Sequence, residues 1–159
     1  MKKVFCLLIL FALLPAFAAA EQEVLLPGGR YAVDVPDRMT YSAPEAGDSG
    51  VEAYISETLE MDYLSYPKTE WIRQGMKESL RETAEELASR GEEIELRSIN
   101  GIEALCFRVT DEADGTPCIA YVFEDGETLI EINFWYATQE AADETKKIME
   151  TIRQTNGEE

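Results

Sequence analysis

The chain has 159 residues, of which 32 are Asp or Glu, 14 are Lys or Arg and none is His, so its formal charge is −18 at pH 7. So acidic a surface repels nucleic acid and anionic membranes, and we expect no nucleic-acid partner. The absence of His removes the commonest general base and metal ligand, which excludes Ser-His-Asp and Cys-His catalysis.

The first twenty residues have the pattern of an export signal. Lys2 and Lys3 precede an apolar run over residues 4–14, and small residues place the cleavage site between Ala18 and Ala20. The run has 11 residues, whereas a bilayer span needs about 20, so a retained membrane anchor is the weaker alternative. We predict a signal peptide over 1–20 and a product that is secreted or held in the periplasm or cell envelope, without membrane insertion after cleavage.

Cleavage after Ala20 leaves 139 residues with 12 basic and 32 acidic side chains, a formal charge of −20. This length suits one domain, which we place at residues 21–156, followed by a frayed acidic tail at 157–159. The charge favours solubility, and it also suits a basic partner or cations.

Strand-like alternation comes first along the mature chain. It covers residues 31–35, 51–56 and 59–66, and a short strand is expected at 39–42 inside a loop rich in Pro and Gly.

Two segments have the apolar period of a helix. One covers 70–90, with Thr69 as the expected N-cap and Gly91 as the end, and the other covers 139–154, with Thr138 as the expected N-cap.

Between these helices the sequence predicts a four-stranded antiparallel meander. Asn100-Gly101 and Asp125-Gly126 suit two-residue hairpin turns, and a looser turn is expected over 111–116. This register pairs Leu96 with Leu105 and Tyr121 with Ile130. It gathers one apolar face, with Phe107, Tyr121 and Ile132 on the same side of the sheet. The opposite face is mixed in polarity, which suggests partial cover by a helix or by the N-terminal strands.

Cys106 and Cys118 are the two cysteines that remain after signal cleavage. Both fall on the mixed face, and a turn centred on Glu112 would pair them. An even number of cysteines in an exported chain favours a disulfide, which would close a 13-residue loop and add about 3 kcal/mol. The alternative is two free buried thiols.

The order of elements resembles the PsbP-like superfamily. The segment Tyr31-Ala32-Val33-Asp34-Val35-Pro36 is similar to its opening strand, and Ile132-Asn133-Phe134-Trp135-Tyr136 to the run before its last helix. The resemblance implies an α+β fold, an antiparallel sheet flanked by two main helices in an α/β/α sandwich. This fold is shared by a photosystem II extrinsic subunit, a Ran-binding protein and many exported bacterial proteins of unknown role. No functional residue carries over, because fold does not fix function.

The mixed face holds the candidate ligand-binding residues. Glu131 lies in an apolar strand beside Arg108 and Asn133, and Trp135 follows on the same face. A carboxylate pair can hydrolyse glycosides, so Glu131 is also the residue around which a hydrolase is considered. The plainer interpretation is a half-exposed acid paired with an arginine, and an aromatic side chain that seals a helix against the sheet.

The first predicted helix carries the candidate partner-binding stripe. Arg73, Lys77 and Arg81 follow one another at intervals of four residues and would dock an acidic partner. The alternative is that they pair with Glu70, Glu78 and Glu85 on the same helix.

Two acidic turns, at 111–114 and 124–125, have only part of the pattern of a calcium site. Ala113 occupies a position where a ligand is needed, and acids are common turn formers in any case. We therefore expect no metal site and no cofactor. The function expected first is a non-enzymatic exported module that binds an extracellular or envelope protein. The alternatives are a small carboxylate-based hydrolase acting on carbohydrate and a cation-binding acidic protein.

Overall fold

The computed structural model describes residues 20–44 and 51–155. The signal peptide predicted at 1–20, except for Ala20, and the tail at 157–159 lie outside these residues. The elements in chain order are β1 (Glu21–Leu25), β2 (Tyr31–Pro36), β3 (Thr40–Ser42), β4 (Glu52–Ile55), β5 (Leu59–Pro67), α1 (Lys68–Arg73), α2 (Leu80–Ser89), β6 (Ile94–Ile99), β7 (Ile102–Thr110), β8 (Pro117–Asp125), β9 (Thr128–Tyr136), α3 (Gln139–Glu150) and β10 (Arg153–Gln154).

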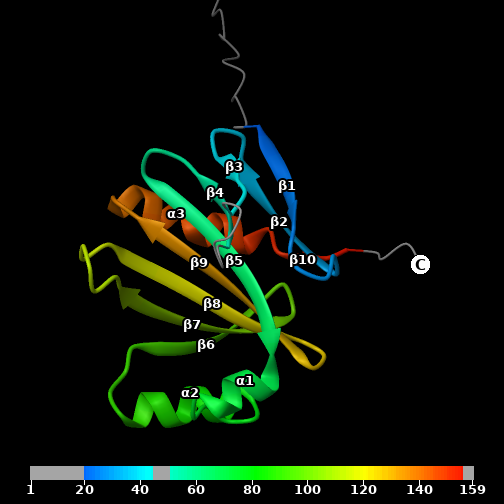
Figure 1. Ribbon diagram of the computed structural model, residues 1–159, viewed down its shortest axis with the longest axis vertical. Coiled ribbons are helices and arrows are strands. Elements are labelled where there is room, and N and C mark those ends of the chain that lie inside the picture. The colour runs from blue at the N-terminus through cyan, green and yellow to red at the C-terminus, as the bar shows by residue number, and fades with distance from the viewer. Residues whose placement is uncertain (1–19, 45–50, 156–159) are drawn as a thin grey trace, which may run out of the picture.

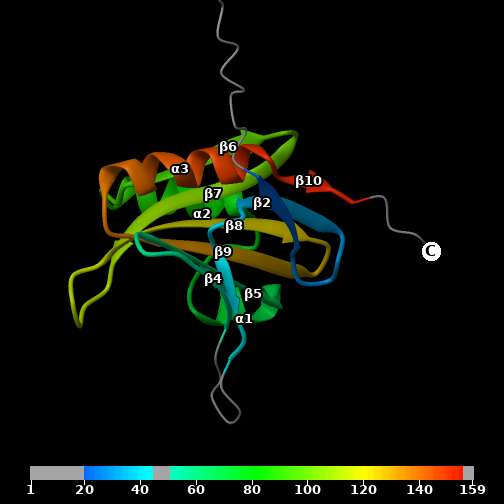
Figure 2. The same ribbon diagram turned by 90° about the horizontal axis from the view of Figure 1, so that it is seen from above.

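The architecture is an α/β/α sandwich of the predicted class. A seven-stranded antiparallel sheet has the order β3-β4-β5-β9-β8-β7-β6, and a three-stranded sheet has the order β1-β2-β10. Figure 1 shows α1 and α2 on one side of the large sheet, and α3 with the small sheet on the other. Figure 2, seen from above, shows α3 leading into β10 beside β2. No helix within the described residues has the length and apolarity that crossing a membrane requires.

The helix predicted over 70–90 is two helices. Gly75, with a φ of +92°, follows the end of α1, and Ser79 caps α2 by accepting from the backbone N–H of Glu82 at 3.2 Å. A φ in this region is easy for Gly and costly for other residues, so the chain turns there. The expected cap at Thr69 is wrong, whereas the end at Gly91 is confirmed, since its N–H donates to the carbonyl of Ala88 at 3.0 Å.

The C-terminal helix begins where the sequence predicts. The hydroxyl of Thr138 accepts from the backbone N–H of Ala141 at 3.2 Å. The helix ends at Glu150, four residues earlier than expected, because the chain continues as β10 against β2.

The turn at Asn100-Gly101 is confirmed together with its register. Both residues have positive φ, of 52° and 82°, and Ile99 pairs with Ile102. The Asn100 side chain also donates to the carbonyls of Glu150 and Ile152, at 2.8 and 2.9 Å, which ties this hairpin to the end of α3.

The register predicted between β7 and β8 is wrong. Cys106 pairs with Tyr121 rather than with Cys118. The loop covers 111–116 as expected, but its flanking pair is Thr110 with Pro117, so it is centred between Ala113 and Asp114 and not on Glu112. The displacement is three residues, and an odd displacement moves every side chain of the following strand to the opposite face. Phe107 therefore lies on the other side of the sheet from Tyr121 and Ile132.

The register between β8 and β9 differs by two residues. Asp125 pairs with Thr128, so the turn consists of Gly126 and Glu127, and Tyr121 pairs with Ile132. An even displacement leaves the faces unchanged. Asp125 is buried in the strand, and Arg30 pairs with it at 2.6 Å, which offsets the cost of burying its charge.

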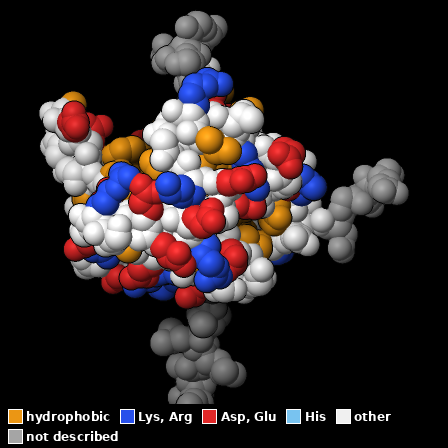
Figure 3. Space-filling model, turned by 90° about the horizontal axis from the view of Figure 1, so that it is seen from below, with side chains coloured by type: hydrophobic (Ala, Val, Ile, Leu, Met, Phe, Trp, Pro, Cys, Tyr) orange, Lys and Arg blue, Asp and Glu red, His pale blue; other side chains and the backbone are white. Residues whose placement is uncertain are grey.

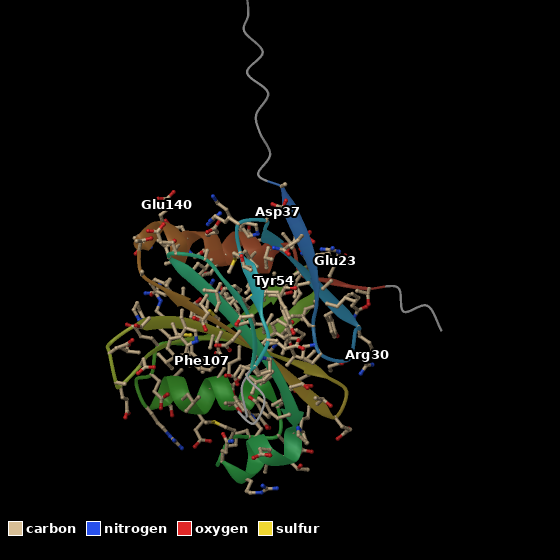
Figure 4. The ribbon with its side chains drawn as sticks, turned by 45° about the horizontal axis from the view of Figure 1, so that its top comes forward. Glu23, Arg30, Asp37, Tyr54, Phe107 and Glu140 are labelled. Carbon is tan, nitrogen blue, oxygen red and sulfur yellow. The ribbon has the colours of Figure 1, made fainter. Side chains whose placement is uncertain are left out.

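Both faces of the large sheet are apolar as a result, in place of the single apolar face predicted. The α3 face packs on α3 and the small sheet through Tyr121, Phe123, Ile130, Ile132 and Phe134. The α2 face packs on α1 and α2 through Leu105, Val122 and Leu129. Figure 4 shows Phe107 between the meander and α2.

The predicted disulfide is absent. Cys106 and Cys118 are both free and buried, and the register puts them on opposite faces, Cys106 beside Tyr121 and Cys118 beside Trp135. Side chains on opposite faces of a sheet point apart, so no bridge between them can form without breaking the pairing.

Candidate functional site

A groove of about 740 Å³ lies between the α2 face and the two helices that cover it. Its aliphatic wall comes from β6, β7 and α2, and its aromatic wall from β5, α1 and β7. Its lining includes Tyr66, Trp71, Phe107, Val109, Glu131 and Tyr136. A volume of this size is typical of sites for small organic ligands.

The groove exists because the covering layer is divided. α1 contacts β5, the third strand of the sheet, and α2 contacts β6 and β7 at the far edge. The break at Gly75 separates the two helices: Leu129, near the start of β9, is buried beneath them, and the groove reaches Glu131 further along the strand. Figure 3 views this side of the molecule and shows acidic and basic side chains mingled around small apolar patches.

Tyr66 and Glu131 form the polar contact on the groove floor. The Tyr66 hydroxyl donates to Oε2 of Glu131 at 2.9 Å. Burial, followed by the charge of Glu131, raises the pKa of Tyr66, so the phenol stays protonated and remains a donor at neutral pH. A carboxylate offers about four acceptor positions, and this bond uses one of them.

Trp71 forms the aromatic wall with Tyr66. The two rings are stacked, with centroids 6.4 Å apart and planes inclined by 28°. Trp71 is 6% exposed, and its indole Nε1 finds no acceptor within the described protein. Among residues 20–44 and 51–155, it is the only buried side-chain nitrogen or oxygen without a hydrogen-bond partner. An unmet buried donor costs about 1–3 kcal/mol.

A second polar cluster lies beside the groove on the same face. Asp62 on β5 accepts from the amide of Asn133 at 2.9 Å and from the indole of Trp135 at 2.8 Å. Burial raises the pKa of Asp62, and these two hydrogen bonds oppose the shift. The cluster fixes the positions of Asn133 and Trp135, and Asp62 itself does not line the groove.

The four candidate ligand residues are therefore only partly brought together. Glu131, Asn133 and Trp135 share the α2 face, as predicted. Arg108 pairs with Ile119 and so belongs to the α3 face by register, although it is exposed and borders the groove. The hydrolase hypothesis requires a second carboxyl opposite Glu131, whereas the other acids that line the groove, Glu92 and Glu93, are exposed on its rim.

The two cysteines show no sign of activation. Burial raises the pKa of Cys118 to about 12 and also raises that of Cys106. Both thiols stay protonated at neutral pH, and the thiolate is the nucleophilic form.

The three basic residues do not form a stripe on one helix as predicted, because they lie on different elements. Arg73 ends α1, Lys77 lies between the helices and Arg81 is in α2. Lys77 pairs with Glu86 at 2.7 Å and Arg81 with Glu103 on β7 at 2.5 Å. The expected pairing on the same helix holds for Arg73, 4.0 Å from Glu70.

The two acidic turns serve the fold. Asp111 accepts from the N–H of Ala113 and Asp114 from that of Thr116, at 2.6 and 2.8 Å, while Glu124 pairs with Lys68 at 2.8 Å. Within the part of the chain that the structure describes, no three His, Cys, Asp or Glu residues are placed to hold a metal ion.

Sequence reasoning missed the central role of Tyr66 and Trp71 in this site. In the sequence, Trp71 falls within the predicted helix 70–90 and Tyr66 at the end of the predicted strand 59–66, and neither carries a further signal. The two side chains meet because β5 runs directly into α1 at Pro67, a junction that the sequence pattern does not reveal.

Comparison with solved structures identifies the fold. A solution structure of cyanobacterial PsbP from Synechocystis sp. PCC 6803 matches 89% of this chain and 96% of its own, with a TM-score of 0.56 and 14% identity. A crystal structure from Bacteroides thetaiotaomicron matches 87% of this chain with a TM-score of 0.58 and 12% identity, and this chain spans half of its length. No family model matches the sequence. No curated protein matches it either. The chain has a PsbP-like fold, and likeness at this identity indicates the fold alone.

Proposed function

We propose that this chain is an exported binding module that takes up a small, largely apolar ligand in the groove on its α2 face. The groove itself is the observation that carries the proposal. It combines a volume of about 740 Å³ with aromatic walls from Tyr66, Trp71 and Phe107. Ligand sites are commonly apolar hollows with a few placed polar groups, and Glu131 and the Trp71 indole are such groups here.

The export part of the proposal rests on the sequence of the first twenty residues. The fold is consistent with it, because β1 begins at Glu21, immediately after the predicted signal, and pairs along its whole length with β2. Expression in a bacterial host, with mass spectrometry of the product outside the cytoplasm, checks this part. A start between Ala19 and Glu21 is expected, and an uncleaved chain in the membrane fraction contradicts it.

The binding part is tested by obstructing the groove. Val109 lines it and is 40% exposed, whereas Val51 is 38% exposed and lines none of the described cavities. We expect a neutral fluorescent probe, N-phenyl-1-naphthylamine, to bind the purified chain saturably. Val109→Trp should weaken this binding at least tenfold, and Val51→Trp should not change it.

Two outcomes overturn the binding proposal. One is a chain that binds the probe weakly and without saturation. The other is equal binding by the two variants, which places the probe outside the groove. Circular dichroism of both variants confirms that the exposed substitutions leave the fold intact.

A further inference from the structure

The groove is acidic as well as aromatic. Its lining includes three carboxylates, of Glu92, Glu93 and Glu131, against the single guanidinium of Arg108. The whole chain adds to this field, since its formal charge is −18. Apolar walls within a negative field favour a positive ligand and disfavour a negative one.

Glu131 is the carboxylate placed to contact such a ligand. It is half-buried on the floor, and the Tyr66 hydroxyl holds one of its oxygens at 2.9 Å. No basic side chain pairs with it among the described residues, whereas Glu124, on the neighbouring strand, has Lys68. A protonated amine in the groove would supply a charge-assisted hydrogen bond to the free acceptor positions of Glu131.

The aromatic wall suits the same ligand. Trp and Tyr faces attract an ammonium group within about 6 Å of the ring centre, and Tyr66, which contacts Glu131, is stacked on Trp71. The ligand that fits these walls therefore has an apolar body and a positively charged nitrogen.

We propose that the ligand of this groove is an organic cation, an amine with an apolar body, whose charge is recognised by Glu131 against the Tyr66–Trp71 wall. This proposal rests on the proposed function, since it names the class of ligand for the same site. The volume and the apolar walls alone would also accept fatty acids or other apolar anions. The proposal excludes such anions as ligands of this groove.

The test uses three probes that differ in one terminal group. A naphthylbutyl chain ending in an amine, an alcohol or a carboxylate is titrated into the purified chain by calorimetry. We expect the amine to bind about tenfold more tightly than the alcohol and the carboxylate to bind most weakly. Raising the salt concentration from 50 to 500 mM should reduce the amine preference, because ions screen the charges on the rim.

Glu131→Gln removes the charge while keeping an acceptor for Tyr66. We expect the preference for amine over alcohol to fall from about tenfold to less than threefold. Glu127→Gln makes the same change of charge in the β8–β9 turn, outside the groove, and should keep the preference. If Glu131→Gln does not fold, the exposed double variant Glu92→Gln/Glu93→Gln should reduce the preference by about half.

The possible outcomes separate the two proposals. Equal binding of amine and alcohol, or tightest binding of the carboxylate, overturns the cation inference and leaves the binding function standing. An amine preference that survives in Glu131→Gln and in the double variant also overturns it. A chain that binds none of the three probes overturns the proposed function itself.

Discussion

The two faces of the large sheet are formed by the same strands but are covered to different extents. On the α3 face, Phe123, Ile132 and Phe134 are completely buried under α3 and the small sheet. On the α2 face, Phe107 and Tyr66 are only half-buried, because α1 and α2 leave a groove between them. One face therefore supplies most of the packing, while the other retains room for a ligand. A sandwich can thus keep one layer incomplete while the opposite layer is closed.

The largest effect that tests this comparison comes from truncating an aromatic side chain on each face. Phe134→Ala should lower the free energy of unfolding by about 3–5 kcal/mol, since Phe134 is fully buried and packs edge-to-face on Tyr121 with centroids 6.0 Å apart. Phe107→Ala should cost about 1–2 kcal/mol. Phe107 is only half-buried, so folding removes less of its apolar surface from water. Urea denaturation measures both, and equal losses would show that the two faces are packed alike.

Breaking ion pairs on the same two sides of the large sheet should give a smaller difference in the free energy of unfolding. Arg153 on β10 donates to both oxygens of Asp34 at 2.9 Å and also contacts Glu23, which joins all three strands of the small sheet. Arg153→Ala should cost about 1–2 kcal/mol, the value typical of charge-assisted hydrogen bonds. Arg81→Ala breaks an exposed pair with Glu103 and should cost less than about 0.5 kcal/mol. A larger loss for Arg81 than for Arg153 would contradict this ranking.

The thiols provide a chemical check on which residues belong to which face. The mature chain should contain two free thiols when unfolded without reductant, since Cys106 and Cys118 are unbridged. In the folded chain both should react slowly with Ellman's reagent at pH 7, Cys106 before the fully buried Cys118, because burial keeps them protonated. Detection of fewer than two thiols after unfolding would mean that a bridge exists and that the β7–β8 register is wrong.

The smallest expected effect concerns Asp62 and pH. Burial raises the pKa of Asp62 in the folded chain above its ordinary value of 3.8, so the folded state binds the proton more tightly than the unfolded one. Its contribution to stability is therefore complete below pH 3.8 and is lost as the pH rises through the folded pKa. Relative to Asp62→Asn, the native chain should lose stability between pH 3.5 and 7. A relative gain over this interval would show that the bonds from Asn133 and Trp135 outweigh burial.

Short-range signals in the sequence predicted the elements well. Thr138 and the Asn100-Gly101 turn are correct, because a cap or a two-residue turn depends on a few adjacent residues. The β7–β8 register was not predictable in this way. The loop at 111–116 is rich in residues that turn easily, so several loop lengths are possible, and an odd error exchanges the faces. The fold survives this error, because strand order and helix positions do not depend on it.

Only the candidate-site residues that lie on one strand were correctly predicted to share a face. Glu131, Asn133 and Trp135 alternate along β9 and share a face whatever their partners are. Arg108 was assigned to them through the wrong register. Tyr66 and Trp71 come together through the β5–α1 junction, and the break at Gly75 opens the groove. β1 was missed, since the polar start Glu21-Gln22-Glu23 of this edge strand hides its alternation.

The most direct test of the groove as the binding site uses the two tryptophan indole N–H signals in a ¹⁵N-edited NMR spectrum. Trp71 lines the groove with its indole unpaired, whereas the Trp135 indole is held by Asp62 at 2.8 Å. On titration with the naphthylbutyl amine, the Trp71 signal should shift with saturation while the Trp135 signal moves little. A Trp71 signal that stays in place while the amine binds elsewhere on the chain would contradict the account.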